Sequence, residues 1–174
     1  MNASVRDTRV LAIDPATRGY GFAVLEGPRR LVDWGVASVR RNKRALSLTR
    51  LAAQIRLFRP GVVVLPDPAD GRHPRCARVR ELIHAMQALA AKEEIKTRLI
   101  SRAHVVSLFA PLGADTKHEI AVAIARRFPA ELAHRVPPPR RPWMPEHHNM
   151  PIFDALALAL AWFHCHEKEH HPRH

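Results

Sequence analysis

Short apolar runs separated by turn residues dominate the first forty positions of the chain. Residues 10–13 are mostly apolar, residues 20–25 are rich in β-forming side chains, and residues 31–39 contain β-branched and aromatic residues. This pattern predicts three consecutive strands joined as an antiparallel meander. Asp14 follows the first run directly, before Pro15, so we expect it at the turn of the first hairpin.

The middle of the chain alternates between helical spacing and strand-like runs. Apolar residues recur at helical intervals up to position 58, and Pro60 ends that predicted helix. Residues 61–65 are continuously apolar and β-branched, which is typical of a strand buried on both faces. A helix is predicted from Pro74 to Lys92, followed by a short strand over residues 97–101.

The last third contains two predicted helices separated by irregular chain. Residues 107–114 have the composition of a loop, and Thr116 with Glu119 then forms the T-x-x-E signature of a capped helix start. Residues 136–145 include five prolines, which predicts a semi-rigid connector that could present Trp143 to a partner. The alanine- and leucine-rich segment after Asn149 predicts a well-buried final helix.

Charge changes this picture more than any other feature of the composition. The 174 residues are 47% hydrophobic, which fits one globular domain, yet 28 Lys and Arg face only 16 Asp and Glu. The resulting net charge of +12 favours a polyanionic partner such as nucleic acid. A generally basic proteome is the alternative explanation.

Several classes of protein are disfavoured by what the sequence contains. The most apolar segment, residues 152–163, is too short to span a membrane and carries Asp154. The opening residues do not resemble a signal peptide, so we expect a cytoplasmic protein. Two cysteines are too few for a disulfide framework, and no P-loop or G-x-S-x-G motif is present. We expect one domain over residues 1–166 and a disordered His-rich tail over residues 167–174.

Acidic residues follow two of the predicted buried strands, and another interrupts the final helix. Asp14 follows the first strand, Asp67 and Asp70 follow the fourth, and Asp154 lies in the last helix. Each has an ordinary explanation, because Asp favours turns and helix N-termini. A carboxylate in an apolar helix is nevertheless costly unless it is paired or bound to metal. Lys117 is also locally unfavourable, since it opposes the dipole at a helix start.

Three motifs together resemble one known family. They are LAIDPATRGYGFAVLE at residues 11–26, GADTKHEIAVAI at residues 113–124 and FDALALALA at residues 153–161. They are similar to the opening strand pair, the lysine-bearing helix and the closing helix of the RuvC family of Holliday-junction resolvases. The resemblance implies the α/β RNase H-like fold of the retroviral integrase superfamily. That fold has a five-stranded mixed sheet, with three antiparallel strands and then parallel strands, flanked by helices.

The resemblance assigns roles to individual residues. Asp14 corresponds to the first metal ligand, Asp154 to the acid of the final helix, and Lys117 to the basic residue near the scissile phosphate. Pro66 occupies the place of the second acid, a glutamate, so Asp67 is the substitute and the third expected metal ligand. Two further departures are Pro151, where another acid is often found, and Ala16 in place of glycine, and the residues that might compensate for a missing acid are Asp70, Glu146 and His148.

The chemistry expected from this set is hydrolysis of a phosphodiester. Carboxylates converging from separate elements suit Mg²⁺, with Mn²⁺ as a substitute, and paired metal ions activate water and stabilise the leaving oxygen. Lys117 would add positive charge beside the phosphate. The basic residues expected to grip nucleic acid are Arg72, Arg75, Arg78, Lys117, Arg140 and Arg141.

The sequence therefore predicts a magnesium-dependent, structure-selective endonuclease for branched double-stranded DNA, with a role in recombination and repair. It needs no small-molecule cofactor and no membrane. Two symmetric nicks require two active sites, so we expect a homodimer, with the helix from Pro74 to Lys92 as its surface unless the apolar stripe of that helix is core. Two alternatives remain, namely an RNA-processing nuclease similar to the YqgF-like proteins and a non-catalytic nucleic-acid-binding module with a degenerate site.

Overall fold

Five strands form one mixed sheet in the order β3-β2-β1-β4-β5. The computed structural model describes residues 8–71 and 75–169. The first three strands are antiparallel, whereas β4 and β5 run parallel to β1. This arrangement confirms the predicted fold class, and the strands are β1 (Arg9–Ala16), β2 (Gly19–Glu26), β3 (Arg30–Ser38), β4 (Val62–Pro66) and β5 (Lys96–Ile100).

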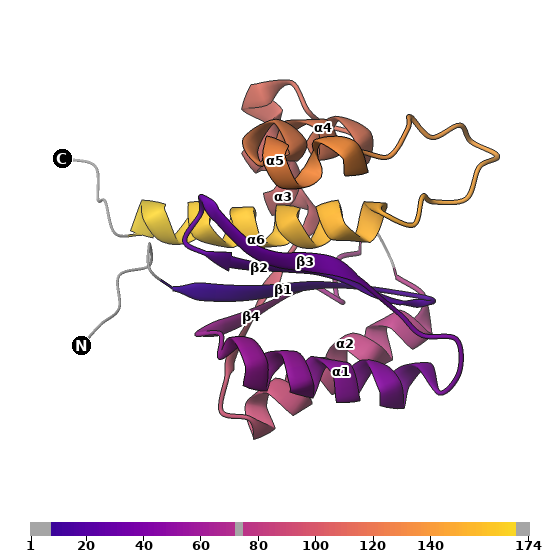
Figure 1. The fold of residues 1–174 in the computed structure, drawn as a ribbon, viewed down its shortest axis with the longest axis vertical. Helices are drawn as coiled ribbons and strands as arrows, with labels where there is room; N and C mark the ends of the chain where they lie inside the picture. The colour runs from indigo at the N-terminus through magenta and orange to yellow at the C-terminus, as the bar shows by residue number, and fades with distance from the viewer. Residues whose placement is uncertain (1–7, 72–74, 170–174) are drawn as a thin grey trace.

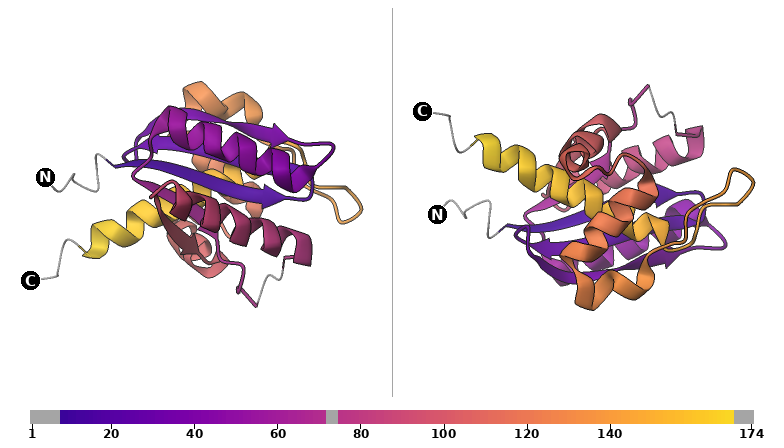
Figure 2. Two further views of the ribbon diagram at one scale, coloured as in Figure 1. Left: turned by 90° about the horizontal axis from the view of Figure 1, so that it is seen from below. Right: turned by 90° about the horizontal axis from the view of Figure 1, so that it is seen from above.

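Helices cover both faces of this sheet, so the central strand β1 is buried on each side (Figure 1). Leu11 and Ile13 contribute to one hydrophobic core, whereas Val10 and Ala12 contribute to the other. The first core lies under α1 and α2, and the second lies under α6 and its neighbours (Figure 2). The helices are α1 (Lys43–Phe58), α2 (Ala77–Lys92), α3 (Arg102–Phe109), α4 (Lys117–Arg127), α5 (Pro129–Leu132) and α6 (Met150–Glu169), with 3₁₀ turns η2 (Ala110–Leu112) and η3 (Ala133–Arg135).

The apolar stripe of α2 belongs to the core of the single chain. Val79, Ile83 and Met86 are buried beneath the sheet together with side chains of α1. Of the two explanations for this stripe, ordinary core is therefore confirmed. Pro74, the expected start of the helix, lies outside the described residues.

The expected loop over residues 107–114 is wrong for its first part, because α3 extends to Phe109. Ser101 caps this helix by accepting a hydrogen bond from the His104 backbone N–H at 3.3 Å. Val105 and Phe109 form its buried side, four residues apart. With only eight residues, the helix shows too little repetition for its apolar spacing to be recognised in the sequence.

Other boundaries agree closely with the sequence. The capping box of Thr116 and Glu119 opens α4 as predicted. Most of residues 136–149 have no regular structure, as the prolines indicated. The final helix continues to Glu169, which is beyond the expected domain boundary at residue 166.

A close contact between α6 and β2 determines where the last helix crosses the sheet. A Cβ atom on Gly21 would lie 2.1 Å from the carbonyl oxygen of Pro151, so only glycine allows this approach. Gly21 is also the cross-strand partner of Asp14. The first turn of α6 is therefore held directly over the strand pair that carries Asp14.

Two further expectations can be compared with the structure. Cys76 and Cys165 form no disulfide. Within residues 8–71 and 75–169, no helix is both long enough and apolar enough to cross a membrane.

Candidate active site

Asp14 lies within β1, two residues before the strand ends, and is only 5% exposed. The expectation that it begins the hairpin turn is therefore wrong, because the strand continues through Pro15 to Ala16. Pairing of Asp14 with Gly21 keeps this part of β1 in the ladder. The rigid strand fixes this buried carboxylate near the end of the central strand.

Arg75 is the cation that pairs with Asp14. One terminal nitrogen of its guanidinium donates to Asp14 Oδ1 at 2.6 Å, and the other donates to the Pro15 carbonyl oxygen at 2.8 Å. The sequence suggested that Arg75 would bind phosphate at the start of a helix. It contains no signal that links this arginine to a residue 61 positions earlier.

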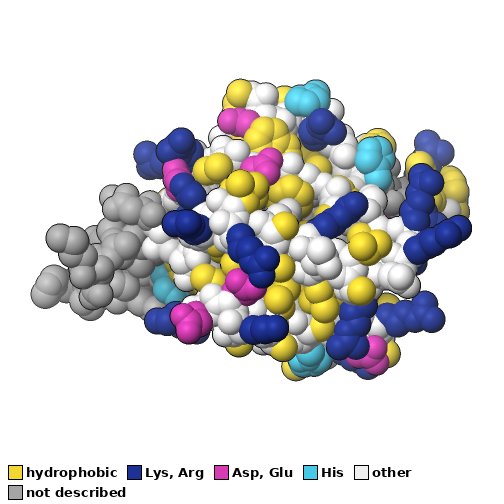
Figure 3. All heavy atoms as spheres, turned by 60° about the horizontal axis from the view of Figure 1, so that its bottom comes forward, with side chains coloured by type: hydrophobic (Ala, Val, Ile, Leu, Met, Phe, Trp, Pro, Cys, Tyr) yellow, Lys and Arg dark blue, Asp and Glu magenta, His cyan; other side chains and the backbone are white. Residues whose placement is uncertain are grey.

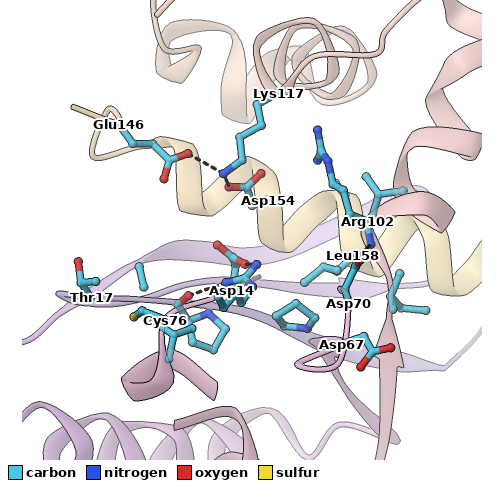
Figure 4. Close-up of a pocket in the computed structure, with 18 residues that line it drawn as sticks. Asp14, Thr17, Asp67, Asp70, Cys76, Arg102, Lys117, Glu146, Asp154 and Leu158 are labelled. Atoms are coloured by element: carbon cyan, nitrogen blue, oxygen red, sulfur yellow. Dashed lines mark hydrogen bonds and ion pairs between the residues drawn. The ribbon is translucent and has the colours of Figure 1, made fainter. Parts of the chain in front are cut away.

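A second ion-pair network joins the starts of α4 and α6 (Figure 4). The ammonium of Lys117 donates to Asp154 Oδ2 at 2.8 Å and to Glu146 Oε1 at 2.6 Å. The side chain of Asp154 is 13% exposed, whereas the side chain of Lys117 is 45% exposed. Glu146 thus joins the site from the segment before α6, and it was one of the acids considered as a replacement ligand.

Burial and neighbouring charges both shift the pKa values of this network. Burial, then Asp14 and to a smaller extent Glu146, raise the pKa of Asp154, and Lys117 lowers it, so that it ends at about 6. Burial lowers the pKa of Lys117, but Asp154, Glu146 and Asp14 raise it more, so it ends above its ordinary value. Three carboxylates therefore share two cations, and the site would gain from additional positive charge.

The acids that follow β4 lie at the edge of the same pocket but have other partners. Asp67 accepts a hydrogen bond from the Ala69 backbone N–H at 2.9 Å, and Asp70 accepts one from the Arg102 backbone N–H at 2.8 Å. Figure 4 shows the Asp67 carboxylate directed away from Asp14 and Asp154. In the part of the chain that the structure describes, no three His, Cys, Asp or Glu side chains gather closely enough to hold a metal ion.

The pocket that contains these residues has a volume of about 410 Å³. Asp14, Lys117, Glu146 and Asp154 line it, and so do Asp67 and Pro66. The structure thus brings Asp14, Lys117 and Asp154 together as predicted. It leaves the Asp67 carboxylate turned toward its own loop.

Of the remaining basic residues expected to contact nucleic acid, Arg78, Arg140 and Arg141 are described and do not line the pocket. Arg78 is exposed on α2, Arg140 and Arg141 are exposed before α6, and Arg72 lies outside the described residues. Lys and Arg side chains are also spread over the face formed by α1 and α2, where they outnumber Asp and Glu (Figure 3).

Comparison with known proteins identifies the fold but provides no sequence relative. No protein-family model matches the chain, and no curated protein matches it. Among solved structures, RuvC of T. thermophilus in complex with Holliday junction substrate is 19% identical with a TM-score of 0.66, covering 92% of this chain and 96% of that one. The yeast mitochondrial Holliday junction resolvase Ydc2 is 14% identical with a TM-score of 0.65, covering 98% and 84%.

A further structure of Thermus thermophilus RuvC is 21% identical, with a TM-score of 0.62 over 91% of this chain and 96% of that one. The sheet order, with an acid on its central strand and another on the last helix, defines an RNase H-like α/β protein. More narrowly, the chain has the RuvC-like fold of the Holliday-junction resolvases, as the opening and closing motifs predicted.

Proposed function

We propose that this protein is a divalent-metal-dependent endonuclease that cleaves phosphodiester bonds in branched DNA. The observation that supports it most is the meeting of Asp14, Lys117 and Asp154 in one pocket, since they come from the first strand, the fourth helix and the last helix. Carboxylates as buried as Asp14 and Asp154 are typical of functional sites. The RuvC-like fold supports the same activity.

The pocket carboxylates would hold a divalent metal ion only after they move closer together than they lie in this structure. Asp14, Asp154 and Glu146 offer the hard carboxylate oxygens that such an ion prefers, and these three acids are paired with only two cations, Arg75 and Lys117. Mg²⁺, or Mn²⁺ in its place, would supply activation of water and stabilisation of the leaving oxygen when bound. Asp67 becomes a ligand only if its side chain leaves the Ala69 backbone N–H.

Lys117 and Arg75 have complementary tasks in this proposal. Lys117 is oriented by two carboxylates, so its ammonium is fixed where a phosphate entering the pocket gains negative charge. Arg75 pairs with Asp14, and its guanidinium would be free to contact a phosphate oxygen if a metal ion replaced it on Asp14.

Branched double-stranded DNA is the proposed substrate, because the net charge of +12 suits a polyanion and a protein of this fold has been solved with a Holliday junction. Cutting both strands symmetrically requires two sites, which a homodimer supplies. Since the apolar stripe of α2 is core, only the outer side of α2 remains for such a contact.

The decisive experiment compares cleavage of a four-way DNA junction and of a structured RNA, with Mg²⁺ and without it. Asp14→Asn and Asp154→Asn are expected to lower the rate of junction nicking by a factor of at least about 100, the scale of removing an electrostatic catalytic contact. Asp115→Asn, an exposed acid before α4, is the matched control and is expected to nick normally.

Two other results would each favour one of the alternative functions. Faster cleavage of RNA than of DNA would favour an RNA-processing nuclease. Tight junction binding that survives both substitutions, with no metal-dependent nicking in the wild type, would favour the non-catalytic module.

A further inference from the structure

The segment over residues 136–149 forms a projecting loop with an exposed indole near its tip. It extends past the ends of the strands beside the start of α6, as the views in Figures 1 and 2 show. Trp143 is 75% exposed and its neighbour Met144 is 40% exposed. A large aromatic side chain held out into solvent is typical of a binding contact rather than of a folding one.

The tip of this loop is ordered by its own hydrogen bonds. The Met144 backbone N–H donates to the Arg141 carbonyl oxygen at 3.0 Å, which closes a four-residue turn with Pro142 in its second position. The Arg140 side chain donates to the Met144 carbonyl oxygen at 2.7 Å. Trp143 therefore sits in a pre-formed turn and loses little freedom when it binds.

The base of the loop is fastened to the candidate active site. Asn149 donates its side-chain amide to the Arg135 carbonyl oxygen at 3.2 Å, which joins the two ends of the loop. Glu146 accepts from Lys117 at 2.6 Å. Glu146 is three positions after Trp143, so their Cα atoms are at most about 11 Å apart. A short length of chain therefore connects Trp143 to the residue that orients Lys117.

The surroundings of the indole favour a nucleic acid. The Arg141 guanidinium carbon lies 5.6 Å from the centroid of the Trp143 ring, so a cation is already placed on the ring. Arg140 adds another exposed positive charge. Glu146 is the only acid in the sequence of this loop, and it is bonded to Lys117. Adjacent positive charge and an aromatic face are the two features that bind single strands.

We propose that Trp143 stacks on an unpaired nucleobase next to the branch point of the DNA, while Arg140 and Arg141 hold the neighbouring phosphates. A base inside a continuous duplex is covered by its neighbours, whereas a base at a branch or in a single strand offers a face for stacking. This inference rests on the proposed function for the identity of the DNA. It adds a base-stacking site outside the catalytic pocket.

The test measures binding of oligonucleotides to the protein in a chelator, because the removal of divalent metal prevents cleavage. The probes are a single-stranded thymidine oligonucleotide and an abasic oligonucleotide of the same length and charge. Trp143→Ala is expected to weaken binding of the thymidine strand at least about 5-fold and to leave binding of the abasic strand unchanged. Trp143→Phe retains an aromatic face and is expected to bind nearly as well as the wild type.

Fluorescence provides a second readout. The thymidine strand is expected to quench the emission of the wild type more than that of Trp143→Phe, whereas the abasic strand quenches neither. Trp34→Phe, a substitution in β3, is the matched control and is expected to retain both binding and quenching.

The stacking site is overturned if Trp143→Ala weakens both strands equally or neither of them, which is also the result expected if the loop contacts another protein. This result is separable from the nuclease activity. If Trp143→Ala nicks junctions normally with Mg²⁺ and the wild type shows no base-dependent binding, only the stacking proposal is wrong. If the wild type shows base-dependent binding but nicks no junction, only the proposed nuclease activity is wrong.

Discussion

Asp154 is a carboxylate in a helix whose neighbouring residues are almost all apolar and buried. Its environment raises its pKa to about 6, from an ordinary value of 3.8, mainly through burial and then through Asp14. The folded protein therefore binds this proton more tightly than the unfolded chain does. Protonation of Asp154 favours folding, so its contribution to stability is present below pH 3.8 and is lost as the pH rises through about 6.

Replacing this residue should consequently stabilise the metal-free protein at the expense of activity. At pH 8 the ionised carboxylate lowers the free energy of unfolding by at most about 3 kcal/mol, and Asp154→Asn removes this penalty. We expect the melting temperature of Asp154→Asn to exceed that of the wild type by several degrees at pH 8 in a chelator. Near pH 4 the two melting temperatures should converge.

Thermal melts of both proteins across this pH range check the prediction, with Asp115→Asn as an exposed control that should follow the wild type. Equal melting temperatures at every pH would show that Lys117 fully compensates the buried charge. Excess Mg²⁺ should stabilise the wild type more than Asp154→Asn, because the substitution removes a proposed ligand.

Single residues differ in how well the sequence revealed their roles. Asp14 and Asp154 were recognisable because charges next to apolar runs are costly without a partner. Asp67 was ambiguous for a physical reason, since a turn acid and a metal ligand use the same carboxylate and only the Ala69 backbone N–H decides its direction here. The pairing of Arg75 with Asp14 depends on the path of the chain between β4 and α2, which no local pattern specifies.

At the scale of elements, the site depends on how closely α6 approaches β2. The first turn of α6 rests on the backbone of Gly21, and this residue is paired with Asp14 in the neighbouring strand. The long elements of the fold were predictable because their apolar periodicity repeats over several turns or strands. The close contact between α6 and β2 was not predictable, because a glycine in a strand pattern does not reveal which element packs against it.

Gly21→Ala should therefore disturb both stability and activity. The added Cβ would lie 2.1 Å from the Pro151 carbonyl oxygen, so backbone must move, at a cost of about 1–3 kcal/mol. We expect a fall of about 3–10 °C in melting temperature. We also expect slower junction nicking below that temperature, because the shift carries Asp154 away from Asp14.

Gly71→Ala is the matched control for this substitution. A Cβ on Gly71 would meet nothing within 4 Å, so the same chemical change should leave melting temperature and nicking unchanged. If Gly21→Ala behaved like Gly71→Ala, the contact between α6 and β2 would have no part in positioning the site.

At the scale of the whole molecule, the elements place several basic segments at the end of the sheet where Asp14 lies. The segment before α1, the start of α2 and the loop over residues 136–149 meet at that end in Figures 1 and 2. The segment before α1 contributes exposed Arg40 and Arg41. By contrast, α2 ends and β5 begins at the opposite end of the sheet, with exposed Lys92 and Lys96. The net charge could be counted in the sequence, but the surface on which the basic residues lie depends on how the strands and helices are arranged.

Binding of DNA at the pocket end would involve the charges at that end and not those at the opposite end. Each phosphate contact contributes about 0.9 to the negative slope of log affinity against log salt concentration. The double substitution Arg40→Gln with Arg41→Gln should therefore reduce that slope by about 2 for a four-way junction in a chelator. Lys92→Gln with Lys96→Gln removes the same charge from the far end, so it should leave the slope unchanged. Equal reductions in both double variants would mean that the overall charge of +12 attracts DNA without a defined binding face. The proposal that DNA binds at the pocket end would then be wrong.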